Sequence, residues 1–220
     1  MRYLNKIVFI NSAAIRYSEV QLDGNIHLIG TQGVGKSTIL RAILFFYNAD
    51  TQRLGIPVEK KSYQDYYFPY ADSSIIYEVA REDGWFTVLS YKTMNRICYR
   101  FIASPYRPDL FIDEEGAPYP SDRIRSVLDK NGIKYSGAIS TYEEYRNILY
   151  GNSDNKRDYS CYSLMESGSY QNIIRTIQNV LLNSRLEADY IKQTIITSLN
   201  EADSVIDLSR YRSHLSGFEA

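Results

Sequence analysis

The sequence predicts an α/β fold, and three observations support this prediction. Short apolar runs separated by turn residues predict β-strands in the first thirty residues. A glycine-rich loop at residues 30–37 joins the last of these runs to a segment with helical apolar spacing. A second group of short runs, between residues 74 and 102, predicts an antiparallel meander. With 220 residues, the chain has the length of one ordinary domain plus a small appendage.

The composition excludes several classes of protein. The 25 Lys and Arg residues face 26 Asp and Glu residues, for a formal net charge of -1, so any contact with DNA needs a local patch or another part of the protein. Two cysteines, Cys98 and Cys161, predict neither a disulfide framework nor a metal site. The absence of a membrane-length apolar run and of a signal-peptide core predicts a cytoplasmic protein. The 21 tyrosines predict many half-buried rings with surface hydroxyls.

Three strands are expected before the glycine-rich loop. The apolar run at residues 7–10 predicts the first, and the loose alternation at residues 16–22 predicts the second. The Asp23-Gly24 pair that follows is a strong hairpin signal. Residues 26–29 are therefore expected to form a third strand, which leads directly into the loop.

The middle of the chain predicts a helix followed by the meander. The apolar positions from Ser37 to Tyr47 have helical spacing, and the helix is expected to stop near residue 48. Strands are expected at residues 74–79, 85–91 and 96–102, with a hairpin turn at Asp83-Gly84. A short strand at residues 111–112 and helices near residues 124–129 and 142–149 complete this region.

The last third of the chain predicts helices. Residues 151–158 have the composition of an exposed loop, and helical spacing follows at residues 170–181 and 186–199. Beyond residue 203, four apolar side chains spaced three and four apart begin a heptad seam: Leu208, Tyr211, Leu215 and Phe218. The predicted organisation is a lobe at residues 1–203 and the start of a coiled-coil helix at residues 204–220.

The glycine-rich loop carries the chemistry. It matches G-x-x-x-x-G-K-[ST] at every fixed position, through Gly30, Thr31, Gln32, Gly33, Val34, Gly35, Lys36 and Ser37, with Thr38 next on the helix. Glycines let the backbone N–H groups approach phosphates, and the helix N-terminus favours an anion. Lys36 supplies a point charge for the β- and γ-phosphates, and Ser37 offers a hydroxyl to Mg²⁺. This P-loop predicts binding of a nucleoside triphosphate with Mg²⁺, and ATP is the expected nucleotide.

The flanking residues resemble a specific group of P-loop proteins. The opening Phe9-Ile10-Asn11-Ser12 and the helix sequence from Ser37 to Phe46 resemble the ATPase heads of SMC, RecF and RecN proteins, which belong to the ABC-like group. Residues 66–79 and the tail at residues 208–215 further resemble the MukB-like and Wadjet-type branch. The resemblance implies a P-loop NTPase core of the ABC/SMC-head type, with an antiparallel β subdomain and C-terminal helices leading into a coiled coil.

Such heads are split, and this chain resembles the N-terminal half. The resemblance implies two partners, namely the C-terminal half of its own head and a second head in an ATP-dependent dimer. It further implies accessory subunits, DNA in the full complex, no membrane and a nucleoid-associated location. Chromosome maintenance, DNA repair and plasmid defence are all compatible processes. The activity implied for the full-length protein is hydrolysis of ATP to ADP and phosphate, with little activity for this chain alone.

The resemblance also suggests two further site residues. An arginine often follows the P-loop helix on a loop that faces ATP, and Arg53 lies at about that distance, with a solvated loop charge as the alternative. A glutamine usually helps to hold Mg²⁺, and Gln171 is the best candidate, against a plain surface role. Lys36 and Arg53 are thus the candidate catalytic residues, and Ser37 and Gln171 the candidate metal ligands.

Two other segments allow more than one interpretation. Residues 110–114 resemble a Walker B motif, in which Asp113 would hold Mg²⁺ and Glu114 would activate water, but the short apolar run favours a solvated turn. A true Walker B would make the chain a self-contained NTPase of another class, and a third alternative is a nucleotide-binding module without turnover. The Lys60-Lys61 pair, with the tyrosines that follow, offers a DNA contact, but a charged loop is favoured.

Overall fold

The computed structural model describes residues 3–24, 26–48, 50, 51, 54, 56, 60–94, 96–151 and 159–164. All of them belong to one unit of the chain, Met1–Leu182. Arg53, Gln171, most of the loop at residues 151–158, and every helix expected after residue 165, including the seam at residues 204–220, lie outside the described residues.

A five-stranded antiparallel sheet forms the centre of the described unit, with strand order β2-β1-β3-β4-β5. The strands are β1 (Tyr3–Ser12), β2 (Ile15–Gln21), β3 (Ser74–Arg81), β4 (Gly84–Thr93) and β5 (Arg96–Ile102). Ile7 of β1 lies opposite Val20 of β2 on one side and Tyr77 of β3 on the other. The predicted first and second strands and the meander are therefore confirmed; β5 has the expected bounds, and the other four strands are longer or shifted by a few residues.

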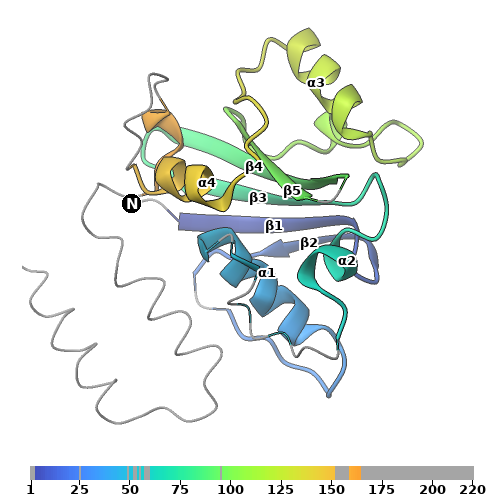
Figure 1. Cartoon of the computed structure of the whole chain (residues 1–220). Helices are drawn as coiled ribbons and strands as arrows, with labels where there is room; N and C mark the ends of the chain where they lie inside the picture. Colours follow the sequence, from blue (N-terminus) through green and yellow to red (C-terminus); the bar gives the residue numbers. More distant parts are fainter. Residues whose placement is uncertain are drawn as a thin grey trace, which may run out of the picture. The chain divides into compact units, whose positions relative to one another are not determined.

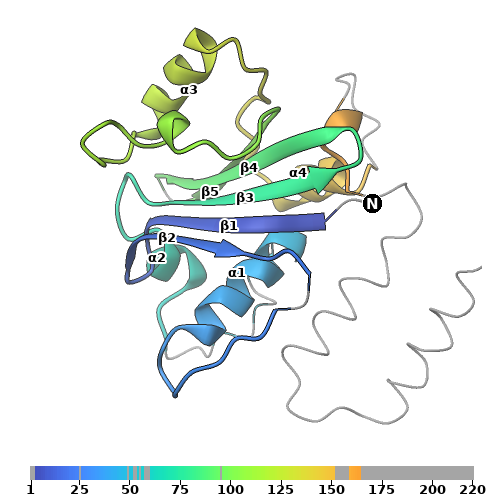
Figure 2. The same cartoon turned by 180° about the vertical axis from the view of Figure 1, so that it is seen from behind.

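Helices cover both faces of this sheet. They are α1 (Lys36–Asn48), α2 (Tyr63–Tyr67), α3 (Ser121–Lys130) and α4 (Tyr142–Leu149), with short 3₁₀ turns η2 (Pro108–Leu110) and η3 (Ser160–Tyr162). Figures 1 and 2 show α1 and α2 on one face and α3 on the other. The three helices expected in this region are confirmed. Within the described part of the chain, no helix has the length and apolarity that a membrane crossing requires.

The alternation of side chains along β1 divides the core in two. Ile7 and Phe9 point to the face covered by α1, α2 and α4. Val8 and Ile10 point to the opposite face, where they join a cluster that includes residues of α3. This period of two is the side-chain pattern of a β-strand, and here both faces are buried. The central strands are consequently apolar on both faces, which explains the continuous apolar run of residues 7–10.

Buried tyrosines form hydrogen bonds between α1 and the elements around it. Four hydroxyls donate to α1 carbonyl oxygens, in the pairs Tyr67 to Thr38 (2.7 Å), Tyr77 to Ala42 (3.1 Å), Tyr145 to Phe46 (2.7 Å) and Tyr150 to Tyr47 (2.7 Å). Three of the acceptors are spaced by four residues and so lie along one side of the helix. The expectation of tyrosine hydroxyls at the surface is therefore wrong for these residues, because their hydroxyls have backbone partners inside the protein.

Removal of one such hydroxyl should measurably destabilise the protein. The ring of Tyr145 is 1% exposed, and its partner, the Phe46 carbonyl, lies in the last turn of α1, where carbonyls lack intrahelical donors. Tyr145→Phe is expected to lower the free energy of unfolding by about 1–3 kcal/mol, because the carbonyl is left unpaired. Urea unfolding measures this loss. The control Tyr142→Phe lies on the same helix at 45% exposure and should change little; equal losses for both variants would contradict the prediction.

The predicted third strand is wrong. Residues 26–29 have no regular secondary structure, and Ile29 is 91% exposed. A strand needs a neighbour to satisfy its backbone, but β2, the strand just before residues 26–29, pairs with β1 alone among the described strands. Asp23-Gly24 accordingly follows β2 without opening a hairpin. The strand expected at residues 111–112 is likewise reduced to a single bridge between Ile112 and Pro118.

Candidate functional site

The glycine-rich loop passes directly into the first turn of α1. Gly33 and Gly35 have φ angles of +90° and +94°, which residues with a side chain rarely adopt. The carbonyl of Gly35 accepts hydrogen bonds from the N–H groups of Thr38 (3.0 Å) and Ile39 (3.1 Å). The backbone therefore turns at the glycines and starts the helix at Lys36, so that the partial positive charge of the helix N-terminus lies at the loop.

Lys36 folds back along the loop. Its Nζ donates to the carbonyl oxygens of Gly30 (2.5 Å) and Thr31 (2.7 Å). Both contacts are solvent-exposed, and the ammonium is therefore kept beside the loop without being buried. Ser37 follows on the first turn of α1, where its side chain is exposed. This arrangement places one cation and one hydroxyl at the N-terminal end of the helix.

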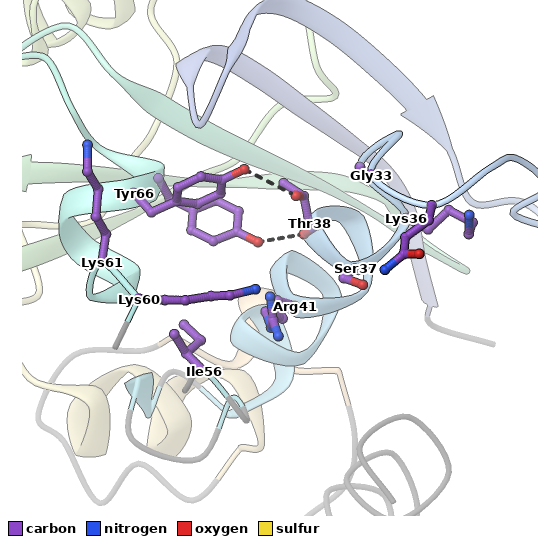
Figure 3. A pocket seen from close by; sticks show the side chains of 12 residues that line it. Gly33, Lys36, Ser37, Thr38, Arg41, Ile56, Lys60, Lys61 and Tyr66 are labelled. Atoms are coloured by element: carbon purple, nitrogen blue, oxygen red, sulfur yellow. Dashed lines mark hydrogen bonds between the residues drawn. The ribbon is translucent and has the colours of Figure 1, made fainter. Parts of the chain in front are cut away.

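A cavity of about 840 Å³ opens at this end of α1. The loop and helix contribute Gln32, Gly33, Gly35, Lys36, Ser37, Thr38 and Arg41 to its walls. The segment before α2 contributes Ile56, Lys60 and Lys61, and α2 itself contributes Tyr66 and Tyr67. Figure 3 shows Tyr66, Lys60 and Ile56 on the side of the cavity toward α2, and Gly33 and Lys36 at the loop end of α1. Four of the described lining residues are cationic, and none of these twelve is Asp or Glu. Such a cavity has a positive potential and favours an anionic ligand.

Of the loop residues predicted to bind nucleotide, the structure places six in the cavity walls: Gln32, Gly33, Gly35, Lys36, Ser37 and Thr38. Gly30 and Thr31 contribute carbonyl oxygens that hold Lys36, and Val34 directs a side chain that is 58% exposed to solvent. Arg53 and Gln171 lie outside the described residues. No cluster of three His, Cys, Asp or Glu residues that could hold a metal ion occurs in the described ranges. Binding of Mg²⁺ at this site would therefore depend on the hydroxyl of Ser37.

The structure adds a role to the residues just before α2. Lys60 and Lys61 lie exposed in a loop, as expected, and they also line the cavity, which the sequence did not predict. Tyr63 and Tyr67 are 2% and 1% exposed, which rules out the suggestion that they stack on DNA bases. A signal was present in the sequence, because two adjacent lysines and a group of aromatic residues follow the P-loop helix, but their distance from the loop cannot be derived from spacing.

The hydroxyl of Tyr67 ties α2 to the first turns of α1. It donates to the Thr38 carbonyl at 2.7 Å. Burial raises the pKa of Tyr67 above its usual value, so the hydroxyl stays protonated and remains a donor at every physiological pH. Ser62 caps α2 by accepting a hydrogen bond from the N–H of Asp65 at 3.1 Å. The α2 wall of the cavity is thus fixed from both ends.

Residues 110–114 form a turn, as favoured by the sequence. The carboxylate Oδ1 of Asp113 accepts hydrogen bonds from the N–H groups of Glu115 (3.0 Å) and Ala117 (2.7 Å). Leu110 and Phe111 pack in the cluster on the α3 face of the sheet, opposite to α1. Neither Asp113 nor Glu114 lines the cavity. The carboxylate of Asp113 therefore holds a turn together, and the two acidic residues do not belong to the cavity at the P-loop.

A model of a known protein family matches most of this chain. Residues 12–215 match the family described as "Protein of unknown function (DUF3584)". This range spans most of the chain, and the chain therefore belongs to that family. No curated protein matches the sequence.

Proposed function

We propose that this member of the DUF3584 family binds ATP with Mg²⁺ in the cavity at the N-terminal end of α1. The observation that carries the proposal is the combination of a P-loop sequence with a cavity whose described walls hold four cations and no carboxylate. A triphosphate has the matching negative charge. The length of the cavity beyond the loop, as far as Arg41 and Tyr66, leaves room for a nucleoside as well.

Each part of the site has a defined role in this proposal. The backbone N–H groups of residues 32–38 contact phosphate oxygens, that of Thr38 in exchange for its Gly35 carbonyl partner, and the helix N-terminus adds its partial charge. Lys36 exchanges its carbonyl partners for the β- and γ-phosphates. Ser37 binds Mg²⁺, which neutralises part of the phosphate charge when bound. Arg53, facing ATP, and Gln171, as a second Mg²⁺ ligand, belong to the same proposal.

The larger assignment is to the N-terminal half of an SMC-like ATPase head that acts with DNA. It rests on the sequence resemblance and on the cavity, whose described walls carry no carboxylate to activate water. In this proposal the C-terminal half of the head supplies that group, ATP binding drives engagement with a second head, and hydrolysis releases it. Chromosome maintenance, DNA repair and plasmid defence are the processes that fit such an ATPase.

Titration of the chain with a fluorescent ATP analogue tests nucleotide binding directly. We expect saturable binding that Mg²⁺ strengthens, because the cation screens repulsion among the phosphates. Unlabelled ATP and inorganic tripolyphosphate should both displace the analogue, and AMP should do so poorly, since it lacks the β- and γ-phosphates that Lys36 contacts. Absence of saturable binding, or equal displacement by AMP and ATP, would overturn the proposal.

The isolated chain is expected to show little or no steady ATP turnover. Each preorganised group that stabilises a transition state commonly contributes a factor of ~10² to 10³, and the described residues of the cavity walls include no carboxylate. A phosphate-release assay measures this. Glu114→Gln should leave the rate unchanged, because Glu114 does not line the cavity. Steady turnover that Glu114→Gln abolishes would instead support the self-contained NTPase.

A further inference from the structure

Tyr66 differs from the other aromatic residues near the cavity in its exposure. Its side chain is 38% exposed, whereas Tyr63 and Tyr67 on the same helix are almost completely buried. Tyr66 lines the cavity, and its hydroxyl lies 3.5 Å from Oγ1 of Thr38 on the P-loop helix. In Figure 3 the ring lies beside the first turn of α1, at the side away from Lys36. An exposed aromatic ring thus stands at the end of the cavity beyond the phosphate-binding loop.

A row of buried rings holds Tyr66 in place. Phe45 of α1 stacks on Tyr63 with ring centroids 4.4 Å apart, and Tyr63 stacks on Tyr67 at 4.1 Å. Tyr66 meets Tyr67 edge to face, at 5.1 Å and an angle of 81° between the rings. This geometry leaves at least one face of Tyr66 uncovered by Tyr67. The contact with Tyr67 restricts the positions open to the Tyr66 ring, which lowers the conformational entropy that a stacked base would cost.

The position of the ring follows the expected direction of a bound nucleotide. Lys36 and the loop fix the triphosphate at one end of the cavity, so the nucleoside must extend along α1, past Thr38, toward α2. The far walls there are Ile56 and Tyr66, an apolar side chain and an aromatic ring, with Lys60 between them and Arg41. An apolar and aromatic wall at this end suits a flat, weakly polar base. It does not suit a phosphate, which is charged.

We propose that Tyr66 is the base-stacking residue of this site, and that it sets the affinity for a nucleotide over a bare polyphosphate. The inference rests on the proposed function. Stacking does not depend on hydrogen bonding to a particular base edge, so this ring discriminates weakly among bases and favours the larger purines. Tyr66 is a binding residue in this assignment and takes no part in phosphate chemistry.

Competition titrations with two ligands on the 220-residue chain test the assignment. Tyr66→Ala is expected to weaken Mg-ATP binding roughly tenfold, the usual effect of removing one base–aromatic stack. Binding of Mg-tripolyphosphate, which has no base, should be unchanged. Tyr66→Phe retains the ring and should bind ATP nearly as wild type does. Tyr70→Ala, a 63% exposed tyrosine outside the cavity walls, is the matched control and should change neither ligand.

The outcomes separate this inference from the proposed function. Equal weakening of both ligands by Tyr66→Ala, or no effect on ATP, overturns the stacking role while nucleotide binding stands. Failure of the wild-type chain to bind either ligand overturns both. Thermal unfolding of each variant is recorded alongside. A weaker ATP affinity in Tyr66→Ala counts against stacking if the melting temperature of that variant is also lowered and if Tyr66→Phe does not restore the affinity.

Discussion

Lys36→Ala is expected to abolish nucleotide binding by the chain. Lys36 is the cavity cation that the loop itself presents, with Nζ within 2.7 Å of the Gly30 and Thr31 carbonyl oxygens. Losing one partner of a close charge pair commonly costs ~2–5 kcal/mol, which is a ~30- to 5,000-fold loss of affinity. Titration with a fluorescent ATP analogue should therefore give no saturation at concentrations that saturate the wild type.

The stability of the Lys36→Ala variant should stay close to that of the wild type. The two carbonyl oxygens that Lys36 contacts are exposed, and water replaces the ammonium as their partner. Lys130→Ala is the matched control, because Lys130 is an exposed cation in the last turn of α3, on the opposite face of the sheet. Equal affinities for wild type and Lys36→Ala, or equal losses in the two variants, would exclude the loop as the phosphate site.

Phe45→Ala is expected to remove much of the stability of the sheet and its helices. Phe45 is 1% exposed and contacts two further rings, Tyr63 at 4.4 Å and Tyr99 at 5.9 Å between centroids. A buried Phe→Ala change commonly costs ~3–5 kcal/mol, because apolar contacts are lost and a cavity remains. That is a large share of the ~5–15 kcal/mol by which a typical domain is stable.

Urea unfolding measures this loss of stability. The fluorescence of Trp85, the single tryptophan, which lies in β4, reports the transition. Met94→Ala serves as the control, since Met94 is 90% exposed and its truncation removes little packing. A Phe45→Ala midpoint within error of the Met94→Ala midpoint would contradict the packing argument. Loss of the Phe45 ring also removes support from Tyr63, and through it from the α2 wall of the cavity.

Local sequence signals located most of the described elements. Alternating apolar runs and the Asp83-Gly84 turn specified β3, β4 and β5, because hairpin pairing depends on neighbouring residues. Helical spacing located α1, which begins at Lys36 inside the P-loop motif. These features depend on residues close in the sequence, since the paired residues of β3 and β4 are at most 17 positions apart, from Ser74 to Tyr91.

Residues 26–29 show where local signals are insufficient. They have a strand composition and a turn before them, yet they form no strand, and Ile29 is 91% exposed. A strand exists only if a neighbouring strand accepts and donates its hydrogen bonds. In the sheet, β2 is an edge strand that pairs with β1 alone among the described strands, so residues 26–29 add no further strand, and no local pattern contains that outcome.

The sequence by itself determined which groups the loop carries, namely glycines with backbone freedom, the charge of Lys36 and the hydroxyl of Ser37. Only the tertiary structure decided what faces the loop. It brings Lys60, Lys61 and Tyr66, more than twenty residues further along the chain, to the same cavity. It does so because Tyr67 is buried and its hydroxyl bonds to the Thr38 carbonyl, a contact whose partners are 29 positions apart.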